Sequence, residues 1–531
     1  MELIKHRNKK LINIAAWLSF GCLFLTFIVS LIEKIIKFPV DDWDHNRLVP
    51  IFAFKLGYKY INAYDTGPVL SWAYGPISPI FFFPSTLTNS PTTATMIGGI
   101  INILILFLPF LVVATFYIRK SRLMFFYGLQ FLLITFFYVV NNQALEYTAF
   151  DIHVDSPSLS LGAISCLLIY FSFITQDDQK NLYLISFAGV TTVLAIWAKH
   201  NLILLPLAII TYLIITGKFK IFKLYLISLI GSGIFFSLII IAIFSHEYLF
   251  FSMVESMAKQ PNVLKNFNLS VAKLSSVNRT LLRASLELLT MIWPFALIIL
   301  SHVVITVKKG KYSNLNTWLI YNPYSLFFIT FFYMIPLAIA SRIKWGGNIN
   351  SLSIAIYFMV LAAFIMFIEV VYKNQANGIK RVINIQKILT IIVVFAIFCS
   401  QINYLKSSPK RINTALNNLQ NNNLEVSFQY MLKNPNQVYF PDYPLSSAMA
   451  ERKIYHSIKG LNDREAGRLR LTAQHFQQYI PSKMKYIAFA DPENKWQKER
   501  IEIMKSYLPQ YSQKITIKDL PGWLVYKLPE S

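Results

Sequence analysis

Residues 92–118 read TTATMIGGIINILILFLPFLVVATFYI, a long apolar stretch with no charged side chain. Roughly 20 apolar residues let a helix cross the hydrocarbon core of a bilayer, where a helix satisfies its own backbone hydrogen bonds. Similar stretches recur along the chain, and from them we predict about eleven membrane-spanning helices. They lie near residues 11–32, 92–118, 123–140, 157–175, 181–198, 201–216, 222–244, 285–307, 324–340, 349–372 and 387–405. The predicted fold class is a mainly α, polytopic membrane helical bundle.

The composition agrees with a membrane protein. Of the 531 residues, 55% are hydrophobic and only 14% are charged, whereas a soluble domain has about 25% charged residues. This excludes a disordered chain, a disulfide scaffold and a soluble nucleic-acid-binding protein. The net charge of +24 comes largely from basic residues that flank the apolar stretches, so it reports membrane topology and predicts no nucleic acid partner.

The basic residues also predict an orientation, because short loops rich in Lys and Arg stay on the cytoplasmic side. They lie in the N-terminal tail and near residues 119–122, 180, 218–223, 308–311 and 373–387. With an odd number of spans these loops share one side, which puts the N-terminus in the cytoplasm and the C-terminus outside. The Ile-, Lys- and Asn-rich composition favours a bacterial host, so we expect a multi-pass protein of the inner membrane.

Two domains follow from this topology. Residues 1–405 form the predicted transmembrane domain, and its outer loop 33–91 carries an acidic motif. Residues 406–531 are polar and predict a small C-terminal α/β domain on the extracytoplasmic side. The expected strands are 438–440, 484–490, 514–517 and 523–527, and the expected helices are 462–480 and 493–508.

The acidic motif of the first outer loop is FPVDDWDH, residues 38–45. Asp41, Asp42, Asp44 and His45 form a self-repelling cluster, in which one carboxylate with a raised pKa could act as a general base. The alternative is a helix N-terminus whose acidic first turn faces water. The loop continues with SWAYGPISPI, residues 71–80, where Pro and Gly break the chain and aromatic residues such as Tyr74 sit at the membrane interface. This pattern indicates a folded loop.

The sequence resembles the membrane-embedded GT-C glycosyltransferases, which use polyprenyl-phosphate-linked sugars and include protein O-mannosyltransferases and lipid A aminoarabinose transferases. Four features carry the resemblance: the acidic motif after the first span, the Gly-Pro-rich stretch leading into the second, an acidic residue opening the fourth, and the outer C-terminal domain. It implies inverting transfer of a sugar from a polyprenyl-phosphate donor to a hydroxyl of a lipid, glycan or protein acceptor.

The resemblance also implies roles for acidic residues. The first-loop acid of the family falls on Asp41 or Asp42, as general base or in recognition of the acceptor, with Asp44 and His45 beside it. The second acidic position falls on Asp155, in the segment DIHVDSP that also contains His153. A plain N-cap of the helix that follows explains Asp155 equally well.

Four further residues oppose the positive-inside bias, namely Lys199, His200, Arg342 and Lys344. A leaving polyprenyl phosphate needs cations, because negative charge builds up on its oxygens as the glycosidic bond breaks. We therefore predict that these residues bind the donor phosphate. Snorkelling to lipid headgroups is the alternative. The family more often has Lys-Gln where this chain has Lys199 and His200, which leaves the role of the histidine open.

Two questions stay open at the level of sequence. Asp42 and Asp44, with one residue between them, would suit Mg²⁺ or Mn²⁺, although many relatives with monophosphate carriers lack a metal. A transporter or flippase of a lipid-linked or polar solute is the alternative function, but it would be expected to show paired repeats and charges at mid-membrane depth. No Walker loop, Rossmann fingerprint, HExxH or GxSxG motif is present, so nucleotide, NAD and hydrolase chemistry have no support.

Overall fold

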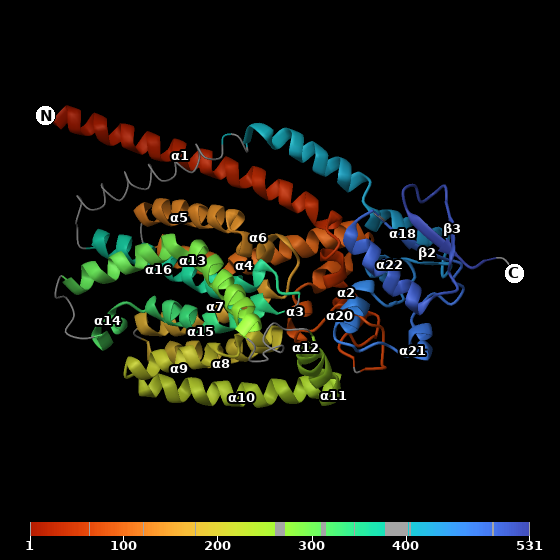
Figure 1. Ribbon diagram of the computed structural model, residues 1–531. Helices are drawn as coiled ribbons and strands as arrows, with labels where there is room; N and C mark the ends of the chain where they lie inside the picture. The colour runs from red at the N-terminus through yellow and green to blue at the C-terminus, as the bar shows by residue number, and fades with distance from the viewer. Residues whose placement is uncertain are drawn as a thin grey trace.

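The computed structural model describes residues 2–62, 64–119, 122–175, 177–260, 271–308, 315–344, 346–376, 402, 405–490 and 493–529. Long helices run side by side, and a smaller unit with a sheet lies at the end of the bundle remote from the N-terminus (Figure 1). The bundle helices are α1 (Glu2–Lys37), α4 (Pro91–Ile118), α5 (Arg122–Asn141), α7 (Asp155–Ile174), α8 (Asp178–Ala198), α9 (Leu205–Ile215), α10 (Phe219–Phe244), α13 (Val271–Lys308), α15 (Ser325–Ile343) and α16 (Ser353–Ala376).

The chain is a multi-pass membrane protein, as predicted. Within the described ranges, seven helices are long and apolar enough to cross a membrane. An eighth is obtained if α5 and α6 (Gln143–Phe150), which meet at a bend of 95°, count as one broken span. The predicted span 201–216 corresponds to a shorter apolar helix, and 387–405 lies almost wholly outside the described residues. The fold class is confirmed, and the count of eleven spans stays a prediction.

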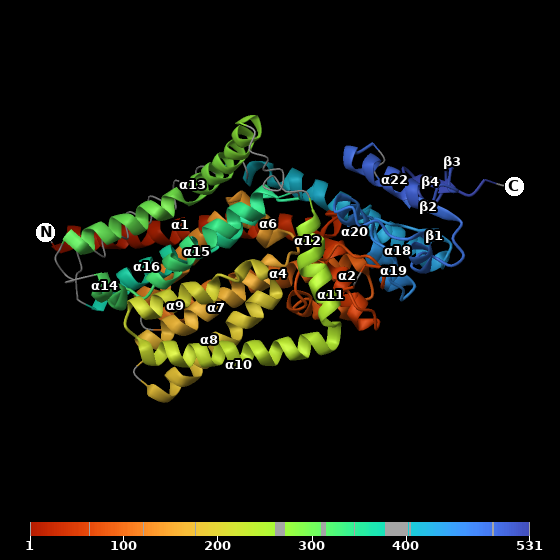
Figure 2. The same ribbon diagram turned by 60° about the horizontal axis from the view of Figure 1, so that its bottom comes forward.

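The bundle is ordered around α16. In the segment Ile349–Lys373, which is α16 with the short helix before it, 89% of the most apolar stretch is buried. In α10 the buried share of the corresponding stretch is 6%. Helices α4, α5, α7, α13 and α15 surround α16, whereas α10 exposes Ile and Phe side chains at the edge, as a lipid-facing helix would. Helix α13 leans away from the bundle (Figure 2).

The first outer loop folds into short helices between the bundle and the sheet-containing unit (Figure 1). They are η1 (Phe38–Val40), α2 (Asp44–Lys55), α3 (Ile77–Ile80) and η2 (Phe83–Leu87). Gly99 of α4 allows the Phe38 ring to pack directly on the helix, because a Cβ at Gly99 would lie 2.3 Å from that ring. Asn102 of α4 donates hydrogen bonds to the carbonyls of Thr148, Ala149 and Asp151. Helix α4 thus fixes both the acidic motif and the loop that leads into α7.

The C-terminal unit is α/β, as expected. Its helices are α18 (Asn423–Lys433), α19 (Pro444–Ala450), α20 (Ile458–Ala466), α21 (Ala473–Gln478) and α22 (Lys495–Tyr507). Its strands β1 (Val438–Tyr439), β2 (Tyr486–Phe489), β3 (Gln513–Ile515) and β4 (Leu524–Lys527) have the order β1-β2-β4-β3. Strand β1 is parallel to β2, and the other pairs are antiparallel. The helix expected over 462–480 is instead two helices, because the chain turns between Gly467 and Thr472.

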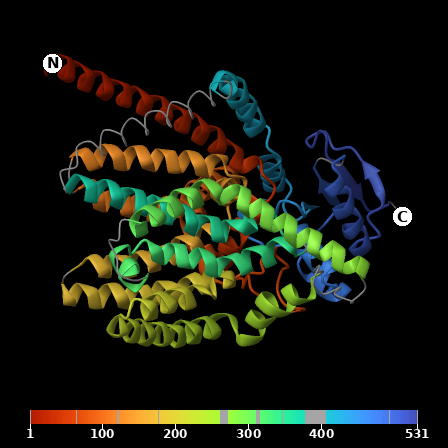
Figure 3. The same cartoon turned by 60° about the vertical axis from the view of Figure 1, so that its left-hand side comes forward.

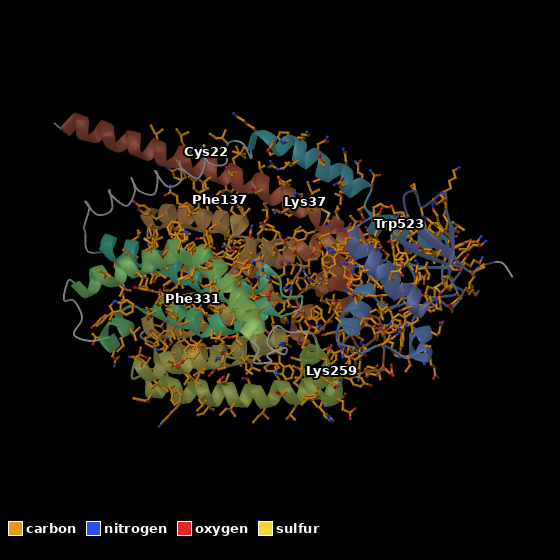
Figure 4. All side chains as sticks on the ribbon, in the orientation of Figure 1. Cys22, Lys37, Phe137, Lys259, Phe331 and Trp523 are labelled. Atoms are coloured by element: carbon orange, nitrogen blue, oxygen red, sulfur yellow. The ribbon has the colours of Figure 1, made fainter. Side chains whose placement is uncertain are left out.

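The two parts share a continuous core. Helix α2 of the first loop packs against α19 of the C-terminal unit, which sits at the bundle end opposite the N-terminus (Figure 3). Side chains fill the spaces between helices, with Phe137 and Phe331 in the bundle, Lys37 near the first loop and Trp523 in the C-terminal unit (Figure 4). The first loop is therefore held on both sides.

Candidate active site

Asp155 is the centre of a buried polar cluster at the end of the bundle that faces the first loop. One carboxylate oxygen, Oδ1, forms an ion pair with the Lys199 ammonium. The other, Oδ2, lies 2.7 Å from His153 Nδ1 and accepts a hydrogen bond of 3.3 Å from the Asn350 amide. Lys199 and Asp155 are both buried. Asp155 is the first residue of α7, and the N-cap position is occupied by Val154. The Asp155 carboxylate bonds to side chains from other segments and does not cap the helix, so the N-cap alternative was wrong.

Tyr74 from the first loop covers this cluster. Lys199 Nζ lies 5.6 Å from the centroid of the Tyr74 ring, within the range of a cation–π contact. The same ring packs edge-on against Trp72, at 5.7 Å, and His153, at 6.1 Å. Gly75 permits this approach, because a Cβ there would lie 1.7 Å from the Trp197 carbonyl oxygen.

Lys344 supplies a positive charge without a fixed partner. No ion pair or hydrogen bond of its ammonium occurs among the described residues. Burial and the neighbouring charge of Lys199 lower the pKa of Lys344 to about 8, against the opposing pull of Asp155 and Asp463. Asp155 pairs directly with Lys199, and Asp463 accepts a hydrogen bond from Ser71. Lys344 therefore has no direct counter-ion among the described residues, and an anion such as a phosphate would supply one.

Arg342 and His200 flank the two lysines in different ways. The Arg342 guanidinium is held by Glu287 of α13, at 2.9 and 3.3 Å, and donates to the Gly347 carbonyl. It thus ties α15 to α13. His200 follows Lys199 directly, and its Nδ1 is buried without a hydrogen-bond partner in the described parts of the chain.

The acidic motif divides into two pairs. Asp44 is fully buried; its Oδ1 accepts a hydrogen bond of 2.6 Å from the Ile152 amide, and its Oδ2 has no partner among the described residues. Burial, with the nearby charges of Asp41 and Asp151, raises the pKa of Asp44. Asp41 is half-buried and accepts a hydrogen bond of 2.7 Å from the Trp43 amide. Because Ile152 adjoins His153, Asp44 lies beside the Asp155 cluster.

Asp42 and His45 face the C-terminal unit instead. Asp42 pairs with Lys459, at 3.1 Å, and Arg500, at 3.0 Å. Burial alone would raise the pKa of Asp42, but these two cations lower it to about 2. His45 stacks on Tyr443 with ring centroids 5.1 Å apart, and burial lowers its pKa to about 3, so the ring is neutral.

Asp42 and Asp44 do not form a shared set of ligands for a metal ion. Asp42 is matched by two cations, whereas Asp44 is bound to a backbone amide. The two carboxylates therefore have different partners and do not converge on one ion. In the described parts of the chain, no group of three or more His, Cys, Asp or Glu residues has the arrangement of a metal site.

The sequence alone does not predict every residue of the site. Asn350 follows the turn that contains Lys344, and Asp463 lies in the polar segment of α20. Neither position belongs to a motif that would predict a role in the site. Lys459 and Arg500 were missed because their partner Asp42 is more than 400 residues away. Only an alignment or a structure could have supplied that signal.

The fold can be compared with solved proteins. No protein-family model matches the sequence, and a search of characterised proteins by sequence gives no match. ArnT from Cupriavidus metallidurans, bound to undecaprenyl phosphate, aligns with a TM-score of 0.54 and 9% identity over 95% of this chain and 98% of its own. The apo state of that protein aligns with 0.52 and 10%, over 95% and 97%. An Archaeoglobus fulgidus oligosaccharyltransferase tethered with an acceptor peptide aligns with 0.46 and 11%, over 97% and 74%.

The two ArnT structures show a likeness of fold, which the resemblance in sequence had implied. ArnT from Cupriavidus metallidurans shares this fold along nearly its whole length. At this level of identity the likeness is one of fold.

Proposed function

We propose that the chain is an inverting membrane glycosyltransferase that moves a sugar from a polyprenyl-phosphate donor to an acceptor hydroxyl on the extracytoplasmic side. The observation that carries the proposal is Lys344, a recessed cation without a partner among the described residues, beside the Lys199–Asp155 pair. ArnT, which shares the fold, has been solved with undecaprenyl phosphate bound. The donor phosphate is the anion that pairs with Lys344.

Each residue of the cluster has a separate role in this proposal. Lys344 and Lys199 stabilise the charge on the phosphate oxygens as the glycosidic bond breaks, while Asp155, His153 and Asn350 hold Lys199 in place. Arg342 and His200 border the phosphate. Tyr74, from the first loop, covers Lys199 and His153.

The proton of the acceptor hydroxyl goes to the Asp41–Asp44 pair. Asp42 is a weak base because Lys459 and Arg500 neutralise it, whereas Asp44 has a raised pKa and an oxygen without a partner among the described residues. His45 stacks on Tyr443 of the C-terminal unit and so holds the acidic motif against that unit. The acceptor is a lipid, glycan or protein, and a divalent cation is not required by this scheme.

The location in the cell is part of the same proposal. Domain 406–531 and the site are extracytoplasmic, domain 1–405 spans the bacterial inner membrane, and the N-terminus is cytoplasmic. The proposal agrees with the start of α10 and the ends of α13 and α16, which contain lysines in sequence and lie at the bundle end remote from the C-terminal unit (Figure 1).

The test is release of polyprenyl phosphate from a panel of polyprenyl-phosphate sugars by the purified protein in lipid nanodiscs. Lys344→Met should lower turnover by about 10²-fold or more, as expected for loss of a group that stabilises transition-state charge. The matched control is Lys259→Met, an exposed lysine of α12 (Ser256–Lys259) that pairs with Glu255. Binding of undecaprenyl phosphate without turnover of any donor would contradict the transferase and favour the transporter or flippase.

A further inference from the structure

A small polar pocket lies between the first outer loop and the C-terminal unit, next to the phosphate site. Its walls are formed by Tyr60 and Trp72 of the loop, Phe251 and Gln260 from the segment after α10, and Asp463 of α20. Its volume of about 40 Å³ accommodates a few water molecules or a hydroxymethyl group. Helix α20 can close on the loop because Gly460 faces Leu70, where a Cβ would lie 2.7 Å from the backbone.

Two polar groups of this pocket lack partners. Asp463 Oδ2 accepts a hydrogen bond of 2.9 Å from Ser71 Oγ, but Oδ1 has no hydrogen bond among the described residues. Trp72 is only 7% exposed, and its indole N–H likewise has no partner in the described parts of the chain. Buried donors without partners are rare in folded proteins. One free acceptor and one free donor together match a hydroxyl group, which donates and accepts.

The rest of the wall also suits a sugar. Tyr60 and Trp72 meet edge to face at 6.3 Å, and Phe251 adds a third ring. Rings give an apolar surface for the C–H faces of a saccharide, and the few polar groups fix its orientation. Burial raises the pKa of Asp463 to about 6, so at neutral pH the carboxylate is an acceptor.

The pocket adjoins the proposed site of transfer. Trp72 packs on Tyr74, which in turn covers Lys199. Lys344 is close enough to Asp463 for each charge to shift the other's titration. A group bound at Asp463 would therefore lie beside the donor phosphate.

We propose that this pocket binds the acceptor as a polyhydroxylated group, a saccharide, with one hydroxyl donating to Asp463 and accepting from Trp72. This proposal rests on the proposed function, because only a transferase has an acceptor, and it adds the chemical class of that acceptor. Ser71 is a positioning residue that orients the carboxylate.

The test uses the full chain labelled with 5-fluorotryptophan and followed by ¹⁹F NMR. Among the nine tryptophans, the Trp72 signal is assigned by Trp72→Phe, and the other signals report whether each variant folds. Glycerol is the probe, because it is a small polyol with terminal hydroxymethyl groups of the size that the pocket accommodates. The control, 1,2-dimethoxyethane, has a similar size and no hydroxyl. Glycerol should shift the Trp72 signal in a saturable way.

The variants make the result specific. Asp463→Asn should weaken the glycerol effect about tenfold or more, as loss of a charge-assisted hydrogen bond predicts. Ser71→Ala should weaken it less, and Asp519→Asn, an exposed carboxyl of the same unit, should not change it. An equal shift with 1,2-dimethoxyethane, an unchanged response in Asp463→Asn, or no response up to about 1 M glycerol would overturn the proposal. No sugar donor is used, so this outcome is separate from failure of the transferase assay.

Discussion

The surroundings of Lys344 change the chemistry of its ammonium group. In water an ammonium group keeps its proton up to about pH 10, but burial and Lys199 lower the pKa of Lys344 to about 8. The cost of holding this charge in a recess is removed when an anion binds. The residue therefore couples protonation to phosphate binding.

This coupling predicts the pH dependence of undecaprenyl phosphate binding. Since Lys344 must be charged to bind the anion, affinity should fall about twofold between pH 7 and 8 and by up to tenfold per unit above pH 8. Isothermal titration in nanodiscs measures it. Lys344→Arg, which stays charged, should abolish the fall, and a fall that persists in this variant would exclude Lys344 as its cause.

The acidic motif gives a second prediction for single residues. Asp44→Asn and Asp41→Asn should each lower kcat by about 10²-fold or more if the pair accepts the acceptor proton. Asp42→Asn should leave kcat within about fivefold, because Asp42 is already neutralised by two cations. Equal losses in all three variants, measured in the transfer assay, would rule out this division of roles.

At the scale of elements, the site depends on the close contact between the first loop and the end of α8. Gly75→Ala would place a methyl group 1.7 Å from the Trp197 carbonyl, so the loop must move and Tyr74 must leave Lys199. Overpacking of this kind costs about 1–3 kcal/mol, and donor turnover should fall with it. Gly231→Ala in α10, where nothing lies within 4 Å of the added methyl, is the control, and thermal unfolding monitors both. Wild-type stability and turnover in Gly75→Ala would refute the contact.

At the scale of the whole molecule, an ion-pair network joins the first loop to the C-terminal unit. Lys459, with a side chain 1% exposed, and Arg500 both bind Asp42, and Arg500 also binds Asp442 at 3.2 Å. Removing one partner of a buried charge destabilises the contact, because the remaining charge is left uncompensated.

The prediction for this network is looser docking of the C-terminal unit in Asp42→Asn. The loss should be on the order of 1 kcal/mol, below that of a fully buried pair, because the Asp42 side chain is 41% exposed. Faster hydrogen exchange in α2 and α20 would report it, and Asp42→Asn with Lys459→Met should recover part of the protection. Unchanged exchange in Asp42→Asn would mean that apolar packing alone holds the unit.

Much of the fold could be predicted from the sequence, because a segment that crosses the hydrocarbon core must satisfy its own backbone hydrogen bonds. A stretch such as 92–118 must be a helix in lipid, and the strands near 438–440, 484–490, 514–517 and 523–527 follow from alternating patterns within a polar tail. The long helix expected over 462–480 was wrong, although the break has local signals: Gly467 caps the end of α20, and the Thr472 side chain caps the start of α21.

The sequence by itself determined that this protein spans the membrane many times, and it selected Asp155, Lys199 and Lys344 as unusual charges for their positions. It could not determine which charged side chains form ion pairs with one another. That Asp155 joins Lys199 and Asn350, that Glu287 holds Arg342, and that Asp42 belongs to the C-terminal unit were decided only by the tertiary structure. The physical reason is range: hydropathy acts along a segment of the chain, whereas ion pairs form between side chains that folding brings together across hundreds of residues.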